Sequence, residues 1–145
     1  MTIHERSSAD ACQLTHHPLD GTGMEGWCIT DGQGRYENNE RCTIRFNTPL
    51  TLYPLTFHLE GPGSNGQYYD YITLPHETDR YGGFNFPSEF YISQEDVDTN
   101  QEMVFTTDGS NRNFDGFLIC ARVSGTLTFP PPSPPLPPPP LPPPP

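Results

Sequence analysis

Short segments rich in aromatic and β-branched residues, separated by turn-forming residues, recur along this 145-residue chain and restrict the folds open to it. Residues 42–46 (CTIRF) illustrate the pattern, because alternation places Cys42, Ile44 and Phe46 on one face of a strand. A period of two residues is typical of a β-strand with one buried face. The chain is therefore expected to fold as an all-β domain.

The same pattern predicts about eight short strands, arranged as a two-sheet β-sandwich or a jelly roll. We expect residues 94–100 (QEDVDTN) to form an acidic turn, and no segment predicts a helix. The clearest predicted strands are residues 27–30, 42–46, 51–60, 69–74, 90–92, 103–107 and 117–123.

Alternation also assigns side chains to faces within these strands. After Pro54, which suits a strand edge or a bulge, it places Leu55, Phe57 and Leu59 on one face. In residues 69–74 (YDYITL) it places Asp70 on the face of the apolar Ile72 and Leu74, opposite the tyrosines.

The chain divides into a polar N-terminal arm at residues 1–11, a β-sandwich domain at residues 12–125 and a proline-rich stalk at residues 126–145. The arm lacks apolar periodicity and is expected to be extended or disordered unless a neighbour orders it. Residues 130–145 (PPPSPPLPPPPLPPPP) cannot join a hydrophobic core. They predict a polyproline II rod of roughly 50 Å, at about 3.1 Å per residue.

The formal net charge is −11, and all seven basic residues are arginines. Without a basic stripe to neutralise phosphates, nucleic acid is excluded as a partner. The acidic surface instead attracts metal cations and basic groups of a partner. A membrane span is not expected, because no run of about 18 apolar residues is present.

Four cysteines in a small, lysine-free domain predict two disulfides and a secreted or extracellular location, at a cell surface, in a cell wall or in a matrix. Four cysteines allow three pairings. Residues 1–11 are too polar for a secretion signal, so we expect that the signal was removed or that the chain is part of a longer precursor.

Residues 105–120 (FTTDGSNRNFDGFLIC) predict two strands joined by a polar loop. The loop concentrates oxygen-bearing side chains at Asp108, Ser110 and Asn111, and oxygen ligands are what Ca²⁺ prefers. Alternatively, residues 108–111 form only a turn in which the aspartate side chain accepts a bond from the backbone.

Five short motifs in this order resemble those of the CUB domain family between about Cys28 and Val123. The motifs are YENN at residues 36–39 followed by Cys42, FHLE at residues 57–60, YDYI at residues 69–72, FTTDGS at residues 105–110, and GF at residues 116–117. The resemblance implies a CUB-like jelly-roll β-sandwich of about eight to ten short antiparallel strands and a function in binding rather than catalysis. Consistently, neither a G-x-S-x-G nor an H-E-x-x-H motif is present, and no catalytic residue is expected.

The calcium-binding subset of that family implies a ligand set here. It consists of Glu60, Asp70, Asp108, the backbone carbonyl of Ser110 and the side chain of Asn111. Tyr36 matches the family's tyrosine that hydrogen-bonds the glutamate of the site. Three carboxylates at one end of a small sandwich would also repel one another without a cation. The alternative is that Glu60 and Asp70 are ordinary acids at strand ends.

For the disulfides, the resemblance implies Cys28 to Cys42, the first bridge of the family, which leaves Cys12 to Cys120. The opposite pairing, Cys12 to Cys42 with Cys28 to Cys120, stays open because Cys28 is closer to Cys42 than is usual in the family. The family's second bridge is missing, since no cysteine precedes Tyr69 or Gly82 in the matching motifs.

The proline-rich tail resembles the hydroxyproline-rich, glycosylated segments of algal and plant matrix proteins. The resemblance implies glycans on the tail, with candidate positions Pro131, Pro132, Ser133, Pro134, Pro135, Pro137, Pro138, Pro139, Pro140, Pro142, Pro143, Pro144 and Pro145.

Together these features predict a calcium-dependent protein-binding or assembly module that forms or decorates an extracellular fibre. In the CUB family, acidic calcium ligands also receive a lysine or arginine from the partner. If a neighbouring copy is the partner, the donor is an arginine such as Arg35, Arg80 or Arg112.

A carbohydrate-binding sandwich is the alternative function. It would use exposed aromatic side chains to stack on sugar rings, although aromatic residues in a small domain more often belong to the core. The candidates are Trp27, Tyr68, Tyr69, Tyr81 and Phe84.

Overall fold

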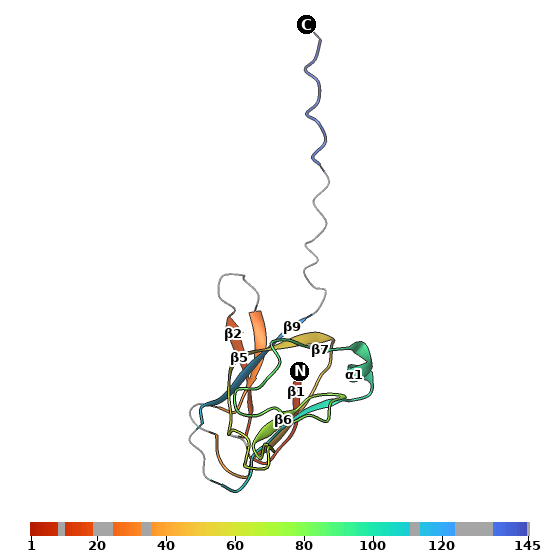
Figure 1. The fold of residues 1–145 in the computed structure, drawn as a ribbon. Coiled ribbons are helices and arrows are strands. Elements are labelled where there is room, and N and C mark those ends of the chain that lie inside the picture. The colour runs from red at the N-terminus through yellow and green to blue at the C-terminus, as the bar shows by residue number, and fades with distance from the viewer. Residues whose placement is uncertain (9–10, 19–24, 33–35, 111–113, 124–134, 145) are drawn as a thin grey trace.

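The computed structural model describes residues 1–8, 11–18, 25–32, 36–110, 114–123 and 135–144. These residues form nine β-strands in two antiparallel sheets, together with one short helix (Figure 1). The predicted all-β sandwich is therefore confirmed. The described part of the proline-rich tail, residues 135–144, is exposed and forms neither helix nor strand.

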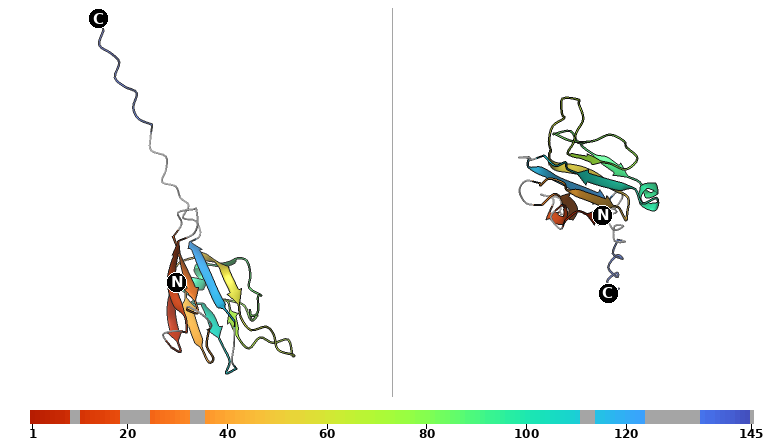
Figure 2. Two further views of the ribbon diagram at one scale, coloured as in Figure 1. Left: turned by 90° about the vertical axis from the view of Figure 1, so that its left-hand side faces the viewer. Right: turned by 90° about the horizontal axis from the view of Figure 1, so that it is seen from below.

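The two sheets differ in size and draw their strands from distant parts of the chain. The four-stranded sheet has the order β1 (Thr2–Arg6), β4 (Arg41–Arg45), β8 (Glu102–Thr106) and β6 (Tyr71–Thr73). The five-stranded sheet has the order β2 (Gln13–Pro18), β3 (Glu25–Thr30), β9 (Gly116–Val123), β5 (Leu50–His58) and β7 (Phe90–Ile92). Figure 2 shows β9 between β3 and β5, so the last strand is central to its sheet.

The core lies between the sheets and is built from the inward faces of their strands. Ile44, Ile72 and Phe105 belong to the four-stranded sheet, and Leu52 and Phe117 belong to the five-stranded sheet; all are buried. The rings of Phe105 and Phe117 meet edge to face across the interface, 4.8 Å between centroids. Burying one such side chain stabilises the fold by about 1.5–3 kcal/mol relative to exposing it.

The predicted faces hold in one strand and fail in part in another. Asp70, Ile72 and Leu74 are buried together, as alternation predicts. The prediction that Leu55 and Leu59 share one face is wrong, because Leu59 is buried and Leu55 is 45 % exposed. The register of β5 against β9 shifts between Pro54 and Thr56. A bulge of this kind inserts one residue and turns the side chains that follow it.

The N-terminal segment differs from the polar arm that the sequence predicts. Residues 2–6 form strand β1, which pairs along the edge of the sheet with β4. Of its side chains, Ile3 packs against the core while the others are exposed. An edge strand is held by backbone hydrogen bonds along one side, so it does not need apolar periodicity.

Residues 94–98 form the helix α1 (Gln94–Asp98), so the prediction of an acidic turn is wrong there. Ser93 caps the helix by accepting a hydrogen bond from the N–H of Asp96, and the Asp96 carboxylate accepts the N–H of Ser93 at 2.8 Å. Such a capping box satisfies backbone donors that would otherwise lack partners at a helix start. No helix in the described part of the chain has the length and apolarity needed to cross a bilayer.

Two disulfides link the four cysteines, and the pairing is Cys12 to Cys42 and Cys28 to Cys120. The preferred prediction, Cys28 to Cys42 with Cys12 to Cys120, is therefore wrong. Strand order explains the difference. Cys28 on β3 lies directly opposite Cys120 on β9 within one sheet, whereas Cys42 lies on β4 in the other sheet. The bridge from Cys12, just before β2, to Cys42 thus joins the two sheets.

We expect the longer bridge to contribute more stability. Chain entropy predicts a loss of about 4 to 5 kcal/mol when Cys28 and Cys120, 92 residues apart, are both replaced by alanine. The same change at Cys12 and Cys42, 30 residues apart, should cost about 3 to 4 kcal/mol. Urea unfolding of the two double variants measures both losses.

The pairing itself is checked by cleaving the unreduced protein after arginine and glutamate, which separates all four cysteines. Mass spectrometry should find the Cys12 peptide linked to the Cys42 peptide. A Cys28–Cys42 peptide would contradict the structure.

Candidate metal centre

Three carboxylates from three separate segments converge at one end of the sandwich. Glu60 follows β5 of the five-stranded sheet, whereas Asp70 precedes β6 and Asp108 follows β8 of the four-stranded sheet. One oxygen of each carboxylate lies within 4.8 Å of the other two. The structure therefore brings together the three acidic side chains of the predicted ligand set, with both sheets contributing.

Tyr36 joins two members of this cluster. Its hydroxyl donates a hydrogen bond to Oδ2 of Asp70 at 2.8 Å and accepts one from the backbone N–H of Glu60 at 3.0 Å. The predicted bond to the glutamate is thus made through the backbone, and the carboxylate that Tyr36 reaches is Asp70. The ring is buried and lies nearly perpendicular to the ring of Phe105.

The surroundings of Tyr36 keep its hydroxyl protonated. Burial raises the pKa of the phenol far above its usual value, and the hydrogen bond to Asp70 and the negative charge of Asp70 raise it further. Tyr36 is therefore a neutral hydrogen-bond donor throughout the physiological pH range.

Asp70 is the most deeply buried member of the cluster, with no exposed surface. Its Oδ1 accepts the backbone N–H of Asp108 at 2.9 Å, while Oδ2 takes the hydroxyl of Tyr36. A buried carboxylate is costly unless hydrogen bonds compensate for lost hydration. Both bonds also fix positions, since they tie the start of β6 to the end of β8 and to the segment before β4.

Asp108 begins the polar loop that follows β8. Its Oδ1 accepts the backbone N–H of Ser110 at 2.9 Å, and the backbone N–H of Asn39 donates to its carbonyl at 2.8 Å. The bond to Ser110 is the side-chain-to-backbone turn expected if the loop has no metal, and it leaves the carboxylate beside Glu60 and Asp70. Asn111 lies outside the described residues.

The chemistry of the cluster favours a hard cation. All three side chains offer oxygen, and among the described residues no histidine or cysteine belongs to the group. Carboxylate, carbonyl and water oxygens suit Ca²⁺ and Mg²⁺, whereas zinc prefers nitrogen and sulfur. Two ionised carboxylates about 5 Å apart repel each other by on the order of 3 kcal/mol at an effective dielectric constant of about 20. A divalent cation between them would offset this repulsion.

The structure describes only some of the arginines and aromatic residues that the sequence offers as binding candidates. Arg35 and Arg112 lie outside the described residues. Arg80 donates to the carbonyl of Tyr68 at 3.0 Å and covers the ring of Tyr71. Of the five candidate aromatic side chains, Trp27, Tyr69 and Phe84 are exposed and Tyr68 and Tyr81 are half-buried, so none belongs to the fully buried core.

The structure also buries the carboxylate of Asp31, which the sequence did not single out as a site residue. Asp31 follows β3 and is 6 % exposed, with its Oδ1 accepting the N–H of Phe117 at 2.9 Å. Gly116 has a φ of 88°, and a Cβ there would lie 2.0 Å from Oδ2 of Asp31. Only glycine can therefore occupy position 116 beside this carboxyl group. Burial raises the pKa of Asp31 to about 6, although the bond from Phe117 opposes the shift.

Comparison with protein-family models, curated proteins and solved structures found no match.

The Asp31 pKa predicts how stability depends on pH. Its folded pKa of about 6 exceeds the ordinary value of 3.8, so the folded state binds the proton more tightly than the unfolded state does. Ionised Asp31 therefore destabilises the fold above pH 6, and this cost disappears as the pH falls toward 4. We expect the unfolding free energy of Asp31→Asn, relative to that of wild type, to rise by about 3 kcal/mol from pH 4 to pH 8.

Urea unfolding of wild type and Asp31→Asn at pH 4, 6 and 8 checks this expectation. A stability difference that stays constant across the three pH values would contradict it.

Tyr36→Phe should destabilise the fold by about 1–3 kcal/mol, because it removes the donor to a buried carboxylate and the acceptor of the Glu60 N–H. Tyr91→Phe is the matched control, since Tyr91 is exposed on β7. Chemical denaturation measures both changes. Equal stability of the two variants would show that the Tyr36 hydroxyl has no special role.

Proposed function

We propose that this chain is a non-catalytic, calcium-dependent protein-binding module of the extracellular space. The observation that carries the proposal is the convergence of Glu60, Asp70 and Asp108 from three segments and both sheets. The resemblance to CUB domains, which rests on the motifs around these residues, supports the same function.

Calcium fits this donor set for reasons of number and geometry. Ca²⁺ takes about six to eight oxygen ligands at about 2.3–2.6 Å and tolerates irregular arrangements. The three carboxylates would supply the charged ligands, and the Ser110 carbonyl, the Asn111 side chain and water would supply neutral ones. Mg²⁺ demands a nearly ideal octahedron and keeps most of its water, so it suits ligands from three loops less well.

A bound cation would also order this end of the domain. Glu60 is attached to the five-stranded sheet, and the two aspartates are attached to the four-stranded sheet. One ion contacting all three would therefore cross-link the sheets where Tyr36 already bridges Glu60 and Asp70. Loops held in this way present a fixed surface, which lowers the entropy lost when a partner binds.

The charge of the chain indicates what the partner presents. With a net charge of −11 and no lysine, the domain attracts a basic group, and an arginine or lysine can bond directly to calcium-ligating carboxylates. Arg80 of a neighbouring copy would first have to leave the Tyr68 carbonyl and the Tyr71 ring. A basic side chain of another protein reaches the site without this cost.

The setting we propose is an extracellular matrix or surface fibre. The two disulfides, Cys12–Cys42 and Cys28–Cys120, are typical of proteins from oxidising compartments. The proline-rich tail, with the glycans implied by its resemblance to hydroxyproline-rich proteins, would display the domain at a distance from its attachment. Assembly with neighbouring copies is part of this proposal.

Calcium titration tests the site directly. At 100 times the dissociation constant, calcium should stabilise wild type by about 2.7 kcal/mol, which corresponds to a rise in melting temperature on the order of 10 °C. Glu60→Gln and Asp108→Asn should each weaken calcium binding by at least about tenfold, because each removes a charged ligand. Calorimetric titration and thermal unfolding with calcium or chelator measure both effects.

Asp98→Asn is the matched control, since Asp98 is an exposed carboxylate at the end of α1 outside the cluster. It should bind calcium like wild type. Unchanged calcium affinity in both cluster variants would sink the assignment of the site.

A further inference from the structure

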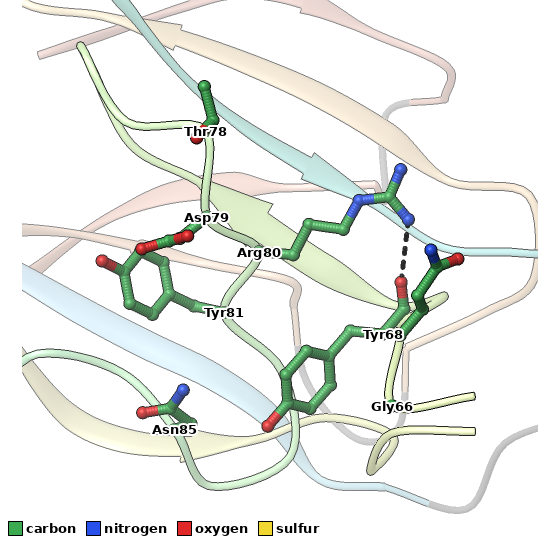
Figure 3. Close-up of a pocket in the computed structure, with 8 residues that line it drawn as sticks. Gly66, Tyr68, Thr78, Asp79, Arg80, Tyr81 and Asn85 are labelled. Atoms are coloured by element: carbon green, nitrogen blue, oxygen red, sulfur yellow. Dashed lines mark hydrogen bonds between the residues drawn. The ribbon is translucent and has the colours of Figure 1, made fainter. Parts of the chain in front are cut away.

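A pocket of about 470 Å³ opens between the loop that precedes β6 and the connection that follows it (Figure 3). Its volume falls in the range of about 300–1,000 Å³ that is typical of small-molecule sites. The lining contains none of the three clustered carboxylates. It consists of Gly66, Gln67, Tyr68, Thr78, Asp79, Arg80, Tyr81 and Asn85.

Two tyrosine rings give the pocket apolar surface, and both rings are held in place. A Cβ added to Gly82 would lie 2.3 Å from the Tyr68 ring, so this ring packs directly on the glycine backbone. The Tyr81 ring packs against the ring of Phe86 in a T-shaped arrangement, and its hydroxyl donates a hydrogen bond to Glu77. Rings fixed before a ligand arrives lose little entropy when the ligand stacks on them.

The polar side chains of the lining provide both donors and acceptors. Asp79 can only accept hydrogen bonds, Arg80 can only donate them, and the amides of Gln67 and Asn85 can do both. Arg80 is oriented by its bond to the Tyr68 carbonyl and by the Tyr71 ring, 4.1 Å from its guanidinium carbon. Asp79 and Arg80 are the only charged residues of the lining, so their formal charges cancel.

We propose that this pocket binds a neutral saccharide. A sugar ring carries hydroxyl groups that donate and accept, which matches the mixed polar lining, and its C–H faces can pack on tyrosine rings. An anionic sugar would be repelled by Asp79, and a cationic sugar would be repelled by Arg80. A proline-rich segment such as residues 130–145 offers many carbonyl acceptors but few donors, because only Ser133, Leu136 and Leu141 have a backbone N–H there, so it matches the acceptor groups of the lining less well.

The saccharide pocket and the carboxylate cluster are neighbours with separate lining. The backbone N–H of Gly83 donates to the Glu60 carbonyl at 2.9 Å, so the connection that holds Tyr81 also contacts the cluster. The two sites are nevertheless testable apart, because saccharide binding requires no metal. Binding measured in chelator therefore tests the pocket whether or not calcium binds to the cluster.

The full chain is applied, in chelator, to an array of neutral hexose and pentose oligosaccharides together with sialylated and sulfated ones. We expect binding to neutral members only. Calorimetric titration with the strongest neutral oligosaccharide should then show that Asp79→Ala and Asn85→Ala each weaken binding by about tenfold or more. Both side chains are exposed, so their truncation should leave the fold intact.

Asp98→Ala is the control, an exposed aspartate outside the pocket that should bind saccharide like wild type. A synthetic peptide of residues 130–145 serves as the comparison ligand. The proposal is overturned if no neutral oligosaccharide binds, if both pocket variants bind like wild type, or if the peptide alone is bound and loses affinity in Asp79→Ala.

Discussion

The hydrogen bonds of Asp70 are the constraint on which the functional end of this domain depends. A carboxylate with no exposed surface is tolerated only when its oxygens are bonded, and here Tyr36 and the Asp108 backbone supply those bonds. The same contacts set the distance between Asp70 and Asp108. The Tyr36 hydroxyl also holds Glu60 nearby, because it accepts a hydrogen bond from the backbone N–H of Glu60. Positioning of the acidic cluster and stability of this end thus arise from one set of interactions.

Negative charge accumulates at this end from both sheets. Besides the cluster, Asp31 lies where β3 ends beside Gly116, the first residue of β9. Gly116 in turn pairs with His58, two residues before Glu60. Ionised carboxylates gathered at this end repel one another, and the burial of Asp31 adds a desolvation cost. If the cluster binds calcium as proposed, the metal compensates part of that repulsion, and stability becomes coupled to calcium concentration.

Much of the site could be predicted from sequence because its members lie in predicted strands or directly after them. Alternation in residues 69–74 placed Asp70 on the buried face, and Asp108 was expected where its strand ends. The burial of Asp31 could not be predicted, since it depends on Gly116, 85 residues away in sequence but adjacent in space. The helix α1 had a local signal, Ser93 three residues before Asp96, that the prediction of an acidic turn overlooked.

By itself the sequence determined the all-β class, most of the strands and the oxygen-rich character of the loops. These are local properties, because a strand's period of two and a loop's composition are written in neighbouring residues. Only the tertiary structure decided which cysteines pair and which aromatic rings line a pocket. Both depend on the order of strands in the sheets: Cys28 meets Cys120 because β3 lies beside β9. Tyr68 and Tyr81 likewise share a pocket because the segments before and after β6 fold onto each other.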